Sequence, residues 1–397
     1  MAFRTLDKAE VRGRRALVRV DFNVPMEDGR IGDDTRLRAA LPTIEDLRSR
    51  GARVILLSHF DRPKGRRVPS MSLQPLVKPL SALLLGAPVA FADDCIGEAA
   101  EKAVAALKDG DVLLLENLRF HAGEEANDPD FVAALARLGD LYVDDAFSAA
   151  HRAHASTEGL AHRLPAYAGR AMQTELEHLE KALGSPERPV MGIVGGAKVS
   201  TKLDLLQNLV GRLQFLAIGG GMANTFLYAQ GHDVGASLCE KDMADTARKI
   251  LKEADAKGCR ILLPTDVVVA LKVEPGAASR TVDLDHVGPE DRILDVGDKS
   301  LAVLLDAMSG CRTLVWNGPL GVFEVPPFDK GTVAAARHAA ALASSGKLIA
   351  VAGGGDTVSA LNAAGVTREF TFVSTAGGAF LEWMEGKTLP GVKALEI

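Results

Sequence analysis

The sequence predicts an α/β protein with two doubly wound, Rossmann-like domains, each built on a mainly parallel sheet. Three observations lead to this prediction. The chain has 397 residues, which is too many for one ordinary core. Short apolar runs alternate with helical patterns along its whole length. Most of these runs are continuously hydrophobic, as expected of parallel strands that are covered on both faces.

The expected strands are ten short apolar runs. In the first half they are 15–20, 53–58, 111–117 and 141–145; in the second they are 190–196, 215–221, 261–266, 313–318, 348–355 and 370–378. Between the later strands, helical spacing predicts helices at 199–211, 240–257 and 329–345. The stretch 164–189 combines a helical pattern with "GSPERP", so we place the domain boundary in this connector.

Composition excludes several classes of protein. Apolar residues make up 47% of the chain and charged residues 25%, a balance typical of globular cytoplasmic proteins. No apolar run approaches the length of a membrane span, and the charged N-terminal stretch has no signal-peptide core. The net charge of −6 argues against nucleic acid as a partner. Four widely spaced cysteines, without a C-x-x-C motif, predict neither a disulfide framework nor a zinc site.

The strand ends of the first half share basic, hydrogen-bonding side chains. Residues 1–170 hold 19 arginines and 5 lysines, whereas the remainder holds 9 and 13. The arginine excess by itself fits either surface composition or a grip on an anionic ligand. Because ligands bind outside the carboxyl ends of such strands, four basic loops in register favour one shared rim. The loops contain Arg19, Asp21 and Asn23; His59 and Arg62; Arg119; and His151, Arg152 and His154.

Glycine-rich motifs follow the strands of the second half: "GGAKVSTK", "GGGMANT", "WNGPLGVFE", "AGGGDT" and "STAGGA". Such loops fit tight turns, and they equally fit phosphate sites in which backbone N–H groups approach the ligand. We expect Lys198 and Lys202 to lie one helical turn apart, with both ammonium groups facing one phosphate chain. Asp356 starts a predicted helix, where its carboxylate could hold Mg²⁺ beside bound phosphates.

Known nucleotide-binding signatures are absent. The sequence has no G-x-x-x-x-G-K-[ST], no G-x-G-x-x-G after the first strand and no H-R-D loop. A P-loop ATPase, a Rossmann dehydrogenase and a protein kinase are therefore disfavoured. The basic rim of the first half and the glycine-rich loops of the second half belong to separate domains. This arrangement predicts an intervening cleft that closes to exclude water.

The motifs, taken together, resemble the phosphoglycerate kinase family from about residue 5 to the C-terminus. They are "RVDFNVP", "SHFDRP", "LLENLRFHAGEE", "DDAFSAAHRAHAS", "GGAKVSTK", "LVWNGPLGVFE", "GGGDT" and "STAGGAFLE", in the family's order. The resemblance implies reversible, in-line transfer of the acyl phosphoryl group of 1,3-bisphosphoglycerate to MgADP on domain closure. The products are 3-phosphoglycerate and MgATP, in glycolysis and gluconeogenesis. The family also implies a monomer.

The resemblance also implies where the ligands bind. Residues 1–170 would form the domain for 3-phosphoglycerate and 1,3-bisphosphoglycerate, 171–189 the interdomain helix and linker, 190–378 the nucleotide domain, and 379–397 a tail packing back on the first domain. The implied substrate residues are Asp21, Phe22, Asn23, Arg36, His59, Phe60, Asp61, Arg62, Arg119 and Arg152. The implied nucleotide residues are Lys202, Gly219, Gly220, Asn317, Pro319, Glu324, Gly353, Gly354, Gly355, Asp356 and Thr357, with Asp356 holding the metal. The implied catalytic groups are Arg36, Lys198, Gly377 and Gly378.

Four residues depart from the family pattern and affect the expected loop geometry: Phe60, Asp61, Ser148 and Ala376. We read His59 as a substrate-loop hydrogen-bonding group, and His151 and His154 as mainly structural. Asp144 and Asp145, at a strand end beside Arg152, are expected to orient that arginine.

The chemistry explains why no general base is needed. In the direction that consumes ATP, the nucleophile is a carboxylate with a pKa of about 4, which is ionised at neutral pH, so the site has to align two anions and neutralise charge. A non-catalytic nucleotide- or anion-binding protein is a rival, which loss of Lys202, Asp356 or Arg36 would have favoured. A second rival is an acyl-phosphate kinase for a carboxylate such as acetate, for which four basic loops are excessive.

Overall fold

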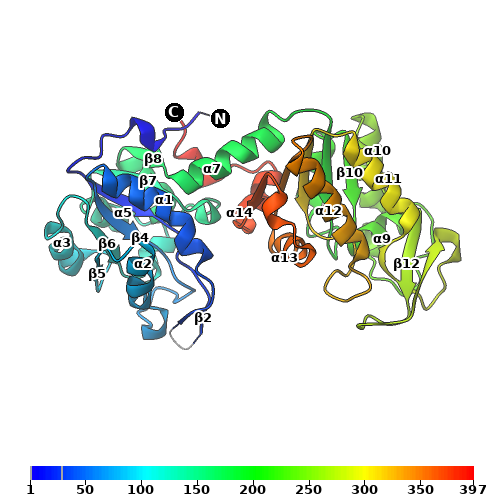
Figure 1. Ribbon diagram of the computed structural model, residues 1–397, viewed down its shortest axis with the longest axis horizontal. Coiled ribbons are helices and arrows are strands. Elements are labelled where there is room, and N and C mark those ends of the chain that lie inside the picture. The colour runs from blue at the N-terminus through cyan, green and yellow to red at the C-terminus, as the bar shows by residue number, and fades with distance from the viewer. Residues whose placement is uncertain (1, 28–29) are drawn as a thin grey trace. The chain divides into compact units, whose positions relative to one another are not determined.

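The computed structural model describes residues 2–27 and 30–397, and its chain divides into two compact units. Unit 1 comprises Met1–Glu177 and Thr388–Ile397, and unit 2 comprises His178–Lys387. Each unit contains a six-stranded parallel sheet with helices around it (Figure 1). This architecture confirms the predicted fold class.

The sheet of unit 1 has the strand order β5-β6-β4-β1-β7-β8, and every neighbouring pair is parallel. Its strands are β1 (Arg15–Arg19), β4 (Arg53–Leu57), β5 (Val89–Ala92), β6 (Val112–Leu115), β7 (Leu141–Asp144) and β8 (Ala166–Ala168). β2 (Met26–Glu27) and β3 (Arg30–Ile31) form a separate antiparallel pair. The helices are α1 (Thr35–Ser49), α2 (Val77–Leu83), α3 (Gly97–Ala105), α4 (Ala122–Glu125), α5 (Pro129–Ala136), α6 (Leu160–Arg163) and α15 (Pro390–Lys393).

The main sheet of unit 2 has the order β11-β10-β9-β15-β16-β17 and is also parallel. Its strands are β9 (Val190–Val194), β10 (Phe215–Ile218), β11 (Arg260–Leu262), β15 (Thr313–Asn317), β16 (Ile349–Gly353) and β17 (Phe372–Ser374). A second, antiparallel sheet contains β12 (Asp266–Ala270), β13 (Ser279–Asp283) and β14 (Arg292–Val296). The helices are α8 (Leu203–Val210), α9 (Gly220–Ala229), α10 (Ala244–Ala256), α11 (Asp298–Ser309), α12 (Lys330–Ser344), α13 (Gly355–Ala364) and α14 (Gly378–Met384).

Strand order places one crevice at the carboxyl ends of each parallel sheet. From β1 the chain first builds β4 on one side and later β7 on the other; from β9 it builds β10 on one side and later β15 on the other. At such a reversal the loops after the two central strands turn in opposite directions and leave room for a ligand. The β1/β7 and β9/β15 loops are therefore the places to look for function.

The ten predicted apolar runs all contain strands, but the sequence missed several others. β5 and β8 have four and three residues and lie at the sheet edges, so their apolar patterns are short. The expected strand 261–266 is divided between β11 and β12, with Pro264 between them. Proline has no N–H group to donate to a sheet ladder, which explains the interruption.

The chain passes between the two units twice. The first division, between Glu177 and His178, lies within α7 (Arg170–Leu179) and inside the expected connector 171–189, whereas the chain rejoins unit 1 at Thr388 and not at the expected 379. Residues of α14 remain in unit 2 because Ala379, Phe380 and Met384 are buried there. In unit 1, the N–H of Gly391 donates to the carbonyl of Ala150 at 2.9 Å, and that of Ile397 donates to Ala2 at 3.1 Å.

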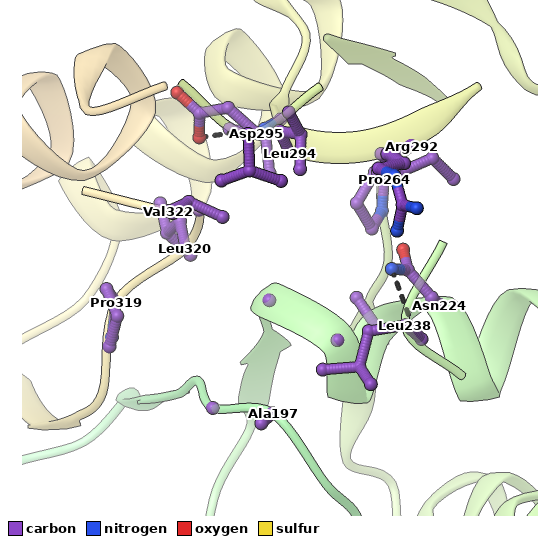
Figure 2. Close-up of a pocket in the computed structure, with 18 of the residues that line it drawn as sticks. Ala197, Asn224, Leu238, Pro264, Arg292, Leu294, Asp295, Pro319, Leu320 and Val322 are labelled. Atoms are coloured by element: carbon purple, nitrogen blue, oxygen red, sulfur yellow. Dashed lines mark hydrogen bonds between the residues drawn. The ribbon is translucent and has the colours of Figure 1, made fainter. Parts of the chain in front are cut away.

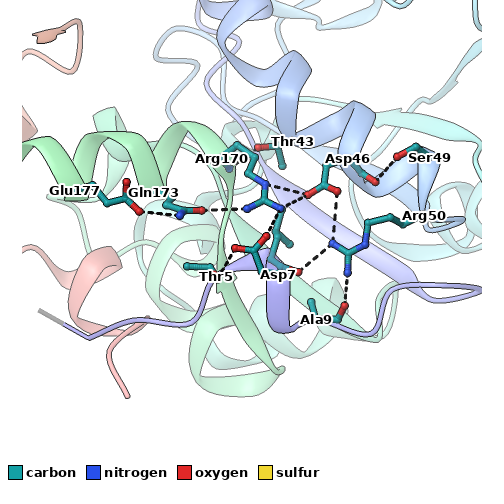
Figure 3. A network of polar contacts seen from close by, with 11 residues as sticks. Thr5, Asp7, Ala9, Thr43, Asp46, Ser49, Arg50, Arg170, Gln173 and Glu177 are labelled. Carbon is teal, nitrogen blue, oxygen red and sulfur yellow. Dashed lines mark hydrogen bonds and ion pairs between the residues drawn. The ribbon is translucent and has the colours of Figure 1, made fainter. Parts of the chain in front are cut away.

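The first turn of α7 is fastened to α1 by a polar network (Figure 3). The Arg170 guanidinium donates to Asp46 at 2.7 Å and to Asp7 at 2.8 Å. The backbone N–H of Arg170 donates to the Thr43 hydroxyl at 2.7 Å. Charge-assisted bonds therefore link α7 to α1.

The described residues include no helix long and apolar enough to cross a membrane.

Candidate active site

The loop after β1 and the start of α1 form one side of the crevice in unit 1. Asp21, in this loop, pairs with the Arg36 guanidinium at 3.1 Å and accepts a hydrogen bond from the Ser148 hydroxyl at 2.5 Å. Arg36 also donates to the carbonyl of Asn23 at 2.7 Å. Its side chain is 38% exposed, so donors not used in these bonds face outward. These bonds hold the Arg36 side chain in place. Ser148, one of the four residues that depart from the expected pattern, supplies a further partner for Asp21.

A buried chain of polar groups lies behind this loop. Arg19, only 1% exposed, donates to the Ser156 hydroxyl at 2.7 Å and lies 3.0 Å from His59 Nδ1. Ser156 in turn donates to the buried carboxylate of Glu124 at 2.5 Å. Because a guanidinium can only donate, His59 Nδ1 accepts, and the neutral imidazole carries its proton on Nε2.

The electrostatics of unit 1 also keep His59 neutral. Burial lowers the pKa of His59 well below its usual value, and the charges of Arg19, Arg119, Arg152 and Arg36 lower it further. Four cations around one imidazole indicate a strongly positive local potential. Such a site favours an anionic ligand, whose charge would offset the mutual repulsion of the guanidinium groups.

Three further predicted arginines differ in how their donors are used. Arg119 is buried and donates to the carbonyl of Asp61 at 2.8 Å, and its Nε makes no hydrogen bond within the described residues but lies 3.5 Å from a carboxylate oxygen of Glu125. Arg152 donates through Nε to His151 at 3.2 Å. Arg62 is exposed. We call Arg36, Arg62, Arg119, Arg152 and His59 the arginine site.

Two predicted substrate residues present no side chain to a ligand. Phe22 is fully buried and Phe60 is 8% exposed, and both belong to the hydrophobic core of unit 1. Only their backbone groups are available for binding. Asp61 adopts φ +52°, a left-handed conformation that glycine prefers and aspartate tolerates, and its N–H donates to Asn23 at 2.9 Å. The loop therefore keeps a glycine-like conformation without glycine.

The expected role of Asp144 and Asp145 is wrong. Asp145 accepts hydrogen bonds from the N–H groups of Ala171 and Met172, so it caps α7 instead of orienting Arg152. Asp144 accepts from the N–H of Ala146. Burial raises the pKa of both carboxyl groups to about 7.

His154 precedes a short π-helix, Ala155–Gly159, and its backbone N–H donates to Thr157 Oγ1 at 3.0 Å. Burial lowers the pKa of His154 to about 4, so this histidine is neutral at neutral pH. These contacts are in keeping with a structural role.

In unit 2, Lys202 joins the loops after β9 and β15. Its ammonium group donates to the carbonyl of Gly195 at 2.6 Å and to Asn317 Oδ1 at 2.7 Å. The other end of the Asn317 amide donates to the carbonyl of Gly353 at 2.9 Å. Burial lowers the pKa of Lys202 to about 8, although the charge of Asp356 opposes this shift. Lys202 is thus a half-buried cation at the junction of three strand ends.

The expected helical pairing of Lys198 with Lys202 is wrong, since α8 begins only at Leu203. The preceding residues form turns, in which Thr201 Oγ1 donates to the carbonyl of Lys198 at 2.8 Å. Glu240 fixes these turns by accepting from the N–H of Ser200 at 3.0 Å and from its hydroxyl. A carboxylate forty positions away therefore overrides the helical pattern.

Glycines let the central loops of unit 2 approach one another. A Cβ atom on Gly195 would collide with the carbonyl of Pro319, and one on Gly318, which has φ +103°, would collide with Gly195. The β9 and β15 loops can pack this closely only without side chains at these positions. Thr357 completes the junction by accepting from the N–H of Gly318 at 2.8 Å.

These loops border a pocket of about 350 Å³ (Figure 2). Its lining includes four predicted residues: Gly220, Pro319, Glu324 and Asp356. The other predicted nucleotide residues do not line it. Gly219 precedes α9, and the hydrogen-bonded junction contains Lys202, Asn317, Gly353 and Thr357. Gly354 and Gly355 begin α13, whose first N–H groups have no side-chain cap. We call this cavity the glycine pocket.

Much of the glycine pocket is apolar, and the sequence motifs located only part of this lining. Leu238, Pro264, Leu294, Leu320 and Val322 line it, together with Gly196 and Ala197. Leu320 and Val322 lie in the motif "WNGPLGVFE", whereas Leu238, Pro264 and Leu294 come from separate segments of unit 2 outside the motifs. Gly377 and Gly378 lie elsewhere, at the start of α14, where Gly377 has φ +55° and no lining role in this pocket.

The residues present fit a magnesium ion that arrives with phosphates. Asp356 is an exposed carboxylate in the first turn of α13 and lines the pocket. Mg²⁺ usually binds through one or two carboxylates plus substrate phosphates and water. Among the described residues, the one cluster of three or more possible metal ligands is Asp94, Cys95 and His121 in unit 1. Unit 2 therefore offers a partial site that bound phosphates would complete.

Comparisons with known proteins give one consistent result. The sequence model of the family described as phosphoglycerate kinase matches residues 6–387. Phosphoglycerate kinase of Caulobacter vibrioides (strain NA1000 / CB15N) is 68% identical over 396 residues, covering 100% of both chains. The phosphoglycerate kinase of Methylobacterium radiotolerans is 63% identical, covering 99% of this chain and 98% of its own.

Solved structures agree with the sequence relatives. Phosphoglycerate kinase from Coxiella burnetii superposes with a TM-score of 0.92 at 40% identity, covering 99% of this chain and 98% of that chain. The enzyme from Pyrococcus horikoshii OT3 gives a TM-score of 0.79 at 31% identity, with 98% of each chain covered. The similarity therefore extends over both units.

Proposed function

This chain belongs to the phosphoglycerate kinase family, and we propose that its arginine site and glycine pocket are the two halves of the kinase site. The chain is a kinase that transfers a phosphoryl group between 1,3-bisphosphoglycerate and ADP, a reaction of glycolysis. In the proposal, the arginine site holds 3-phosphoglycerate or 1,3-bisphosphoglycerate, and the glycine pocket holds ADP or ATP with Mg²⁺.

The observation that carries the assignment of unit 1 is the set of guanidinium groups around neutral His59. A ligand with both a phosphate and a carboxylate matches several separate cations better than a single small anion such as acetate does. In this proposal Arg62, Arg119 and Arg152 anchor the substrate. His59 donates from Nε2, the nitrogen that Arg19 leaves protonated.

The negative charge of both substrates sets the chemical problem. The attacking carboxylate is already ionised, since its pKa is about 4, and no residue has to remove a proton. The chain's task is to align the reacting groups and to neutralise the charge on the equatorial oxygens of the transferring group. We assign this role to Arg36 and Lys198, aided by N–H groups at Gly377 and Gly378.

Unit 2 would bind the nucleotide through its two kinds of surface. The apolar lining around Leu238 and Leu294 suits the faces of a base, whereas Lys202, Glu324 and the start of α13 suit ribose and phosphates. Mg²⁺ held by Asp356 would supply charge neutralisation at the phosphates. Transfer requires the two bound ligands to meet, and domain closure is our prediction for that step. A monomer located in the cytoplasm is also part of the proposal.

One coupled assay tests the substrate assignment. The enzyme is supplied with MgATP and either 3-phosphoglycerate or acetate, and product formation is followed in parallel. We expect turnover with 3-phosphoglycerate alone. Arg62→Ala and Arg152→Ala should each raise KM for 3-phosphoglycerate, and an unchanged KM in both variants would overturn the placement of the substrate.

A further inference from the structure

Asn224 is a polar residue in the glycine pocket to which the proposed function gives no role. It lies in α9 and is 2% exposed. Its Nδ2 donates to the carbonyl of Leu238 at 3.1 Å, as the dashed line in Figure 2 marks. Because a carbonyl only accepts, this bond settles which end of the amide is nitrogen.

The other end of the same amide is unsatisfied. Asn224 Oδ1 is buried and accepts no hydrogen bond from the described residues. Buried amide oxygens in native proteins nearly always have a partner, because leaving one without a donor is unfavourable. Since Asn224 lines the pocket, its missing donor is best supplied by the ligand that occupies the pocket.

The surroundings narrow down what kind of donor fits. Leu238, Pro264 and Leu294 line the same cavity and are apolar, so they suit the flat faces of an aromatic base. An acceptor among them would meet the base at its edge. The edge of adenine carries a donor, the 6-amino group, where hypoxanthine and guanine carry a carbonyl acceptor.

Arg292 is a second polar side chain that could contact the edge of a base. It lines the pocket and donates through Nη1 to the carbonyl of Ala236 at 3.2 Å. The residue is exposed, so water can satisfy its remaining donors. A guanidinium could instead serve a 6-oxo group, and this alternative predicts the opposite base preference.

We propose that Asn224 selects the base of the nucleotide by accepting a hydrogen bond from the 6-amino group of adenine through Oδ1. The same oxygen would face the carbonyl of a 6-oxopurine, leaving two acceptors together. The 6-oxopurines do have an adjacent N1–H, but using it would require the base to slide along the pocket. This inference rests on the proposed function, since it needs a nucleotide in the glycine pocket.

The first test uses the wild-type enzyme and three nucleotides with magnesium: ADP, IDP and purine riboside diphosphate. IDP replaces the amino group by a carbonyl, and purine riboside diphosphate has neither. Calorimetry gives Kd for each, and the coupled assay gives KM and kcat. One hydrogen bond is expected to favour ADP by about threefold to tenfold over purine riboside diphosphate, with IDP weaker still.

The second test removes the acceptor. Asn224→Leu keeps the branching at Cγ and has no polar group, although it is larger, so the preference for ADP over purine riboside diphosphate should disappear. Asn224→Ala is a second variant, should leucine disturb folding. Asn208→Leu is the matched control: that amide donates to the carbonyl of Met384 at 2.6 Å and does not line the pocket, so the ADP preference should survive.

The outcomes separate the two proposals. Equal affinities for all three nucleotides, or a preference that survives in both Asn224 variants, would overturn the role of Asn224 and leave the nucleotide pocket in place. Stronger binding of IDP would assign base reading to Arg292 instead. If none of the nucleotides binds, the proposed function of unit 2 itself fails.

Discussion

The two parallel sheets place their sites at the same topological position but build them from different materials. In unit 1 the crevice is formed by long charged side chains that hold one another, such as the pair of Arg36 with Asp21. In unit 2 it is formed by backbone, because Gly195 and Gly318 pack too closely for any side chain. In our proposal the first design recognises a few fixed charges, whereas the second would surround an extended ligand with N–H groups and apolar walls.

This comparison has a consequence for mutagenesis. A site made of side chains can be dismantled one residue at a time, and each removal should affect a particular step. A site made of backbone has few side chains whose removal is informative without disturbing the fold. We therefore expect the largest single-residue effects on activity in unit 1, and combined effects on binding and stability in unit 2.

Arg36→Ala should have the largest effect. If Arg36 neutralises charge mainly in the transition state, kcat and kcat/KM should fall together by about a hundredfold to a thousandfold. Calorimetry should show little change in 3-phosphoglycerate affinity. Arg38→Ala is the control, because Arg38 lies on the same helix but pairs with Asp34 at the exposed surface. Normal turnover at saturation, combined with much weaker substrate binding, would make Arg36 an anchor instead.

Lys202→Met should weaken MgADP binding and also lower the melting temperature. Loss of charge-assisted hydrogen bonds typically costs about 1.5–3 kcal/mol, or roughly tenfold to a hundredfold in affinity. Because Lys202 bonds to Gly195 and Asn317, the variant should also be less stable, contrary to what a freely exposed lysine would show. Lys257→Met, which removes an exposed pair with Glu253, is the control. An unchanged Kd for MgADP would contradict the assignment.

The pH dependence follows from the same lysine. Its pKa is about 8 in the fold, so the ammonium charge is lost as pH rises through 8, and wild-type affinity for MgADP should fall between pH 7 and 9. An unfolded lysine keeps its proton to about pH 10.4, so between these values the unfolded state binds more protons. The Lys202 contribution to stability must then rise with pH over that window. Lys202→Met should lose both dependences, as calorimetry and thermal unfolding from pH 7 to 10 would show.

Asp356→Asn should have a smaller effect, confined to the metal. A charge pair at 4 Å in water is worth about 1 kcal/mol, so the magnesium concentration for half-maximal activity should rise about fivefold. KM for 3-phosphoglycerate should not change. Asp306→Asn alters an exposed carboxylate that does not line the pocket and serves as the control. The same magnesium midpoint as wild type would rule out Asp356 as the ligand.

Ser156→Ala should have the smallest effect on turnover, because Ser156 acts on the substrate only through Arg19 and His59. The variant removes a partner from both Arg19 and buried Glu124, and should lower stability by about 1–3 kcal/mol. The ¹⁵N NMR signals of His59 should show Nε2 protonated in wild type and a mixture of tautomers in the variant. Ser49→Ala, at an exposed helix end, should change neither property. A wild-type imidazole protonated on Nδ1 would contradict the inferred chain of bonds.

The sequence predicted what depends on local pattern and missed what depends on distant contacts. Continuous apolar runs located the central strands, and the polar residues that follow them placed Asp21 and Asp356 at strand ends, whereas Arg36 came from the family resemblance alone. The helical pairing of Lys198 and Lys202 failed because Glu240 reshapes their turn from forty positions away. Buried Arg19 was read as part of a motif, but its contact with His59 depends on how two strands pair.

Asn224 in the glycine pocket is a second example of a feature that local sequence could not predict. Asn224 attracts no notice in "GGGMANT", since its importance lies in one unsatisfied oxygen. The bond that orients its amide comes from Leu238, on a different segment. Whether a buried polar atom has a partner is decided by packing of the whole unit, and no local pattern records it.

The return of the C-terminal segment to unit 1 also sets an order of completion during synthesis. Unit 2 is one continuous stretch, His178–Lys387, so every one of its contacts is available before Thr388 is added. Unit 1 lacks Thr388–Ile397 until all of unit 2 has been translated, although most of unit 1 leaves the ribosome before unit 2. The bridge between Phe3 and Glu396 joins a residue made before unit 2 to one made after it. The domain that is begun first is therefore the one that is finished last.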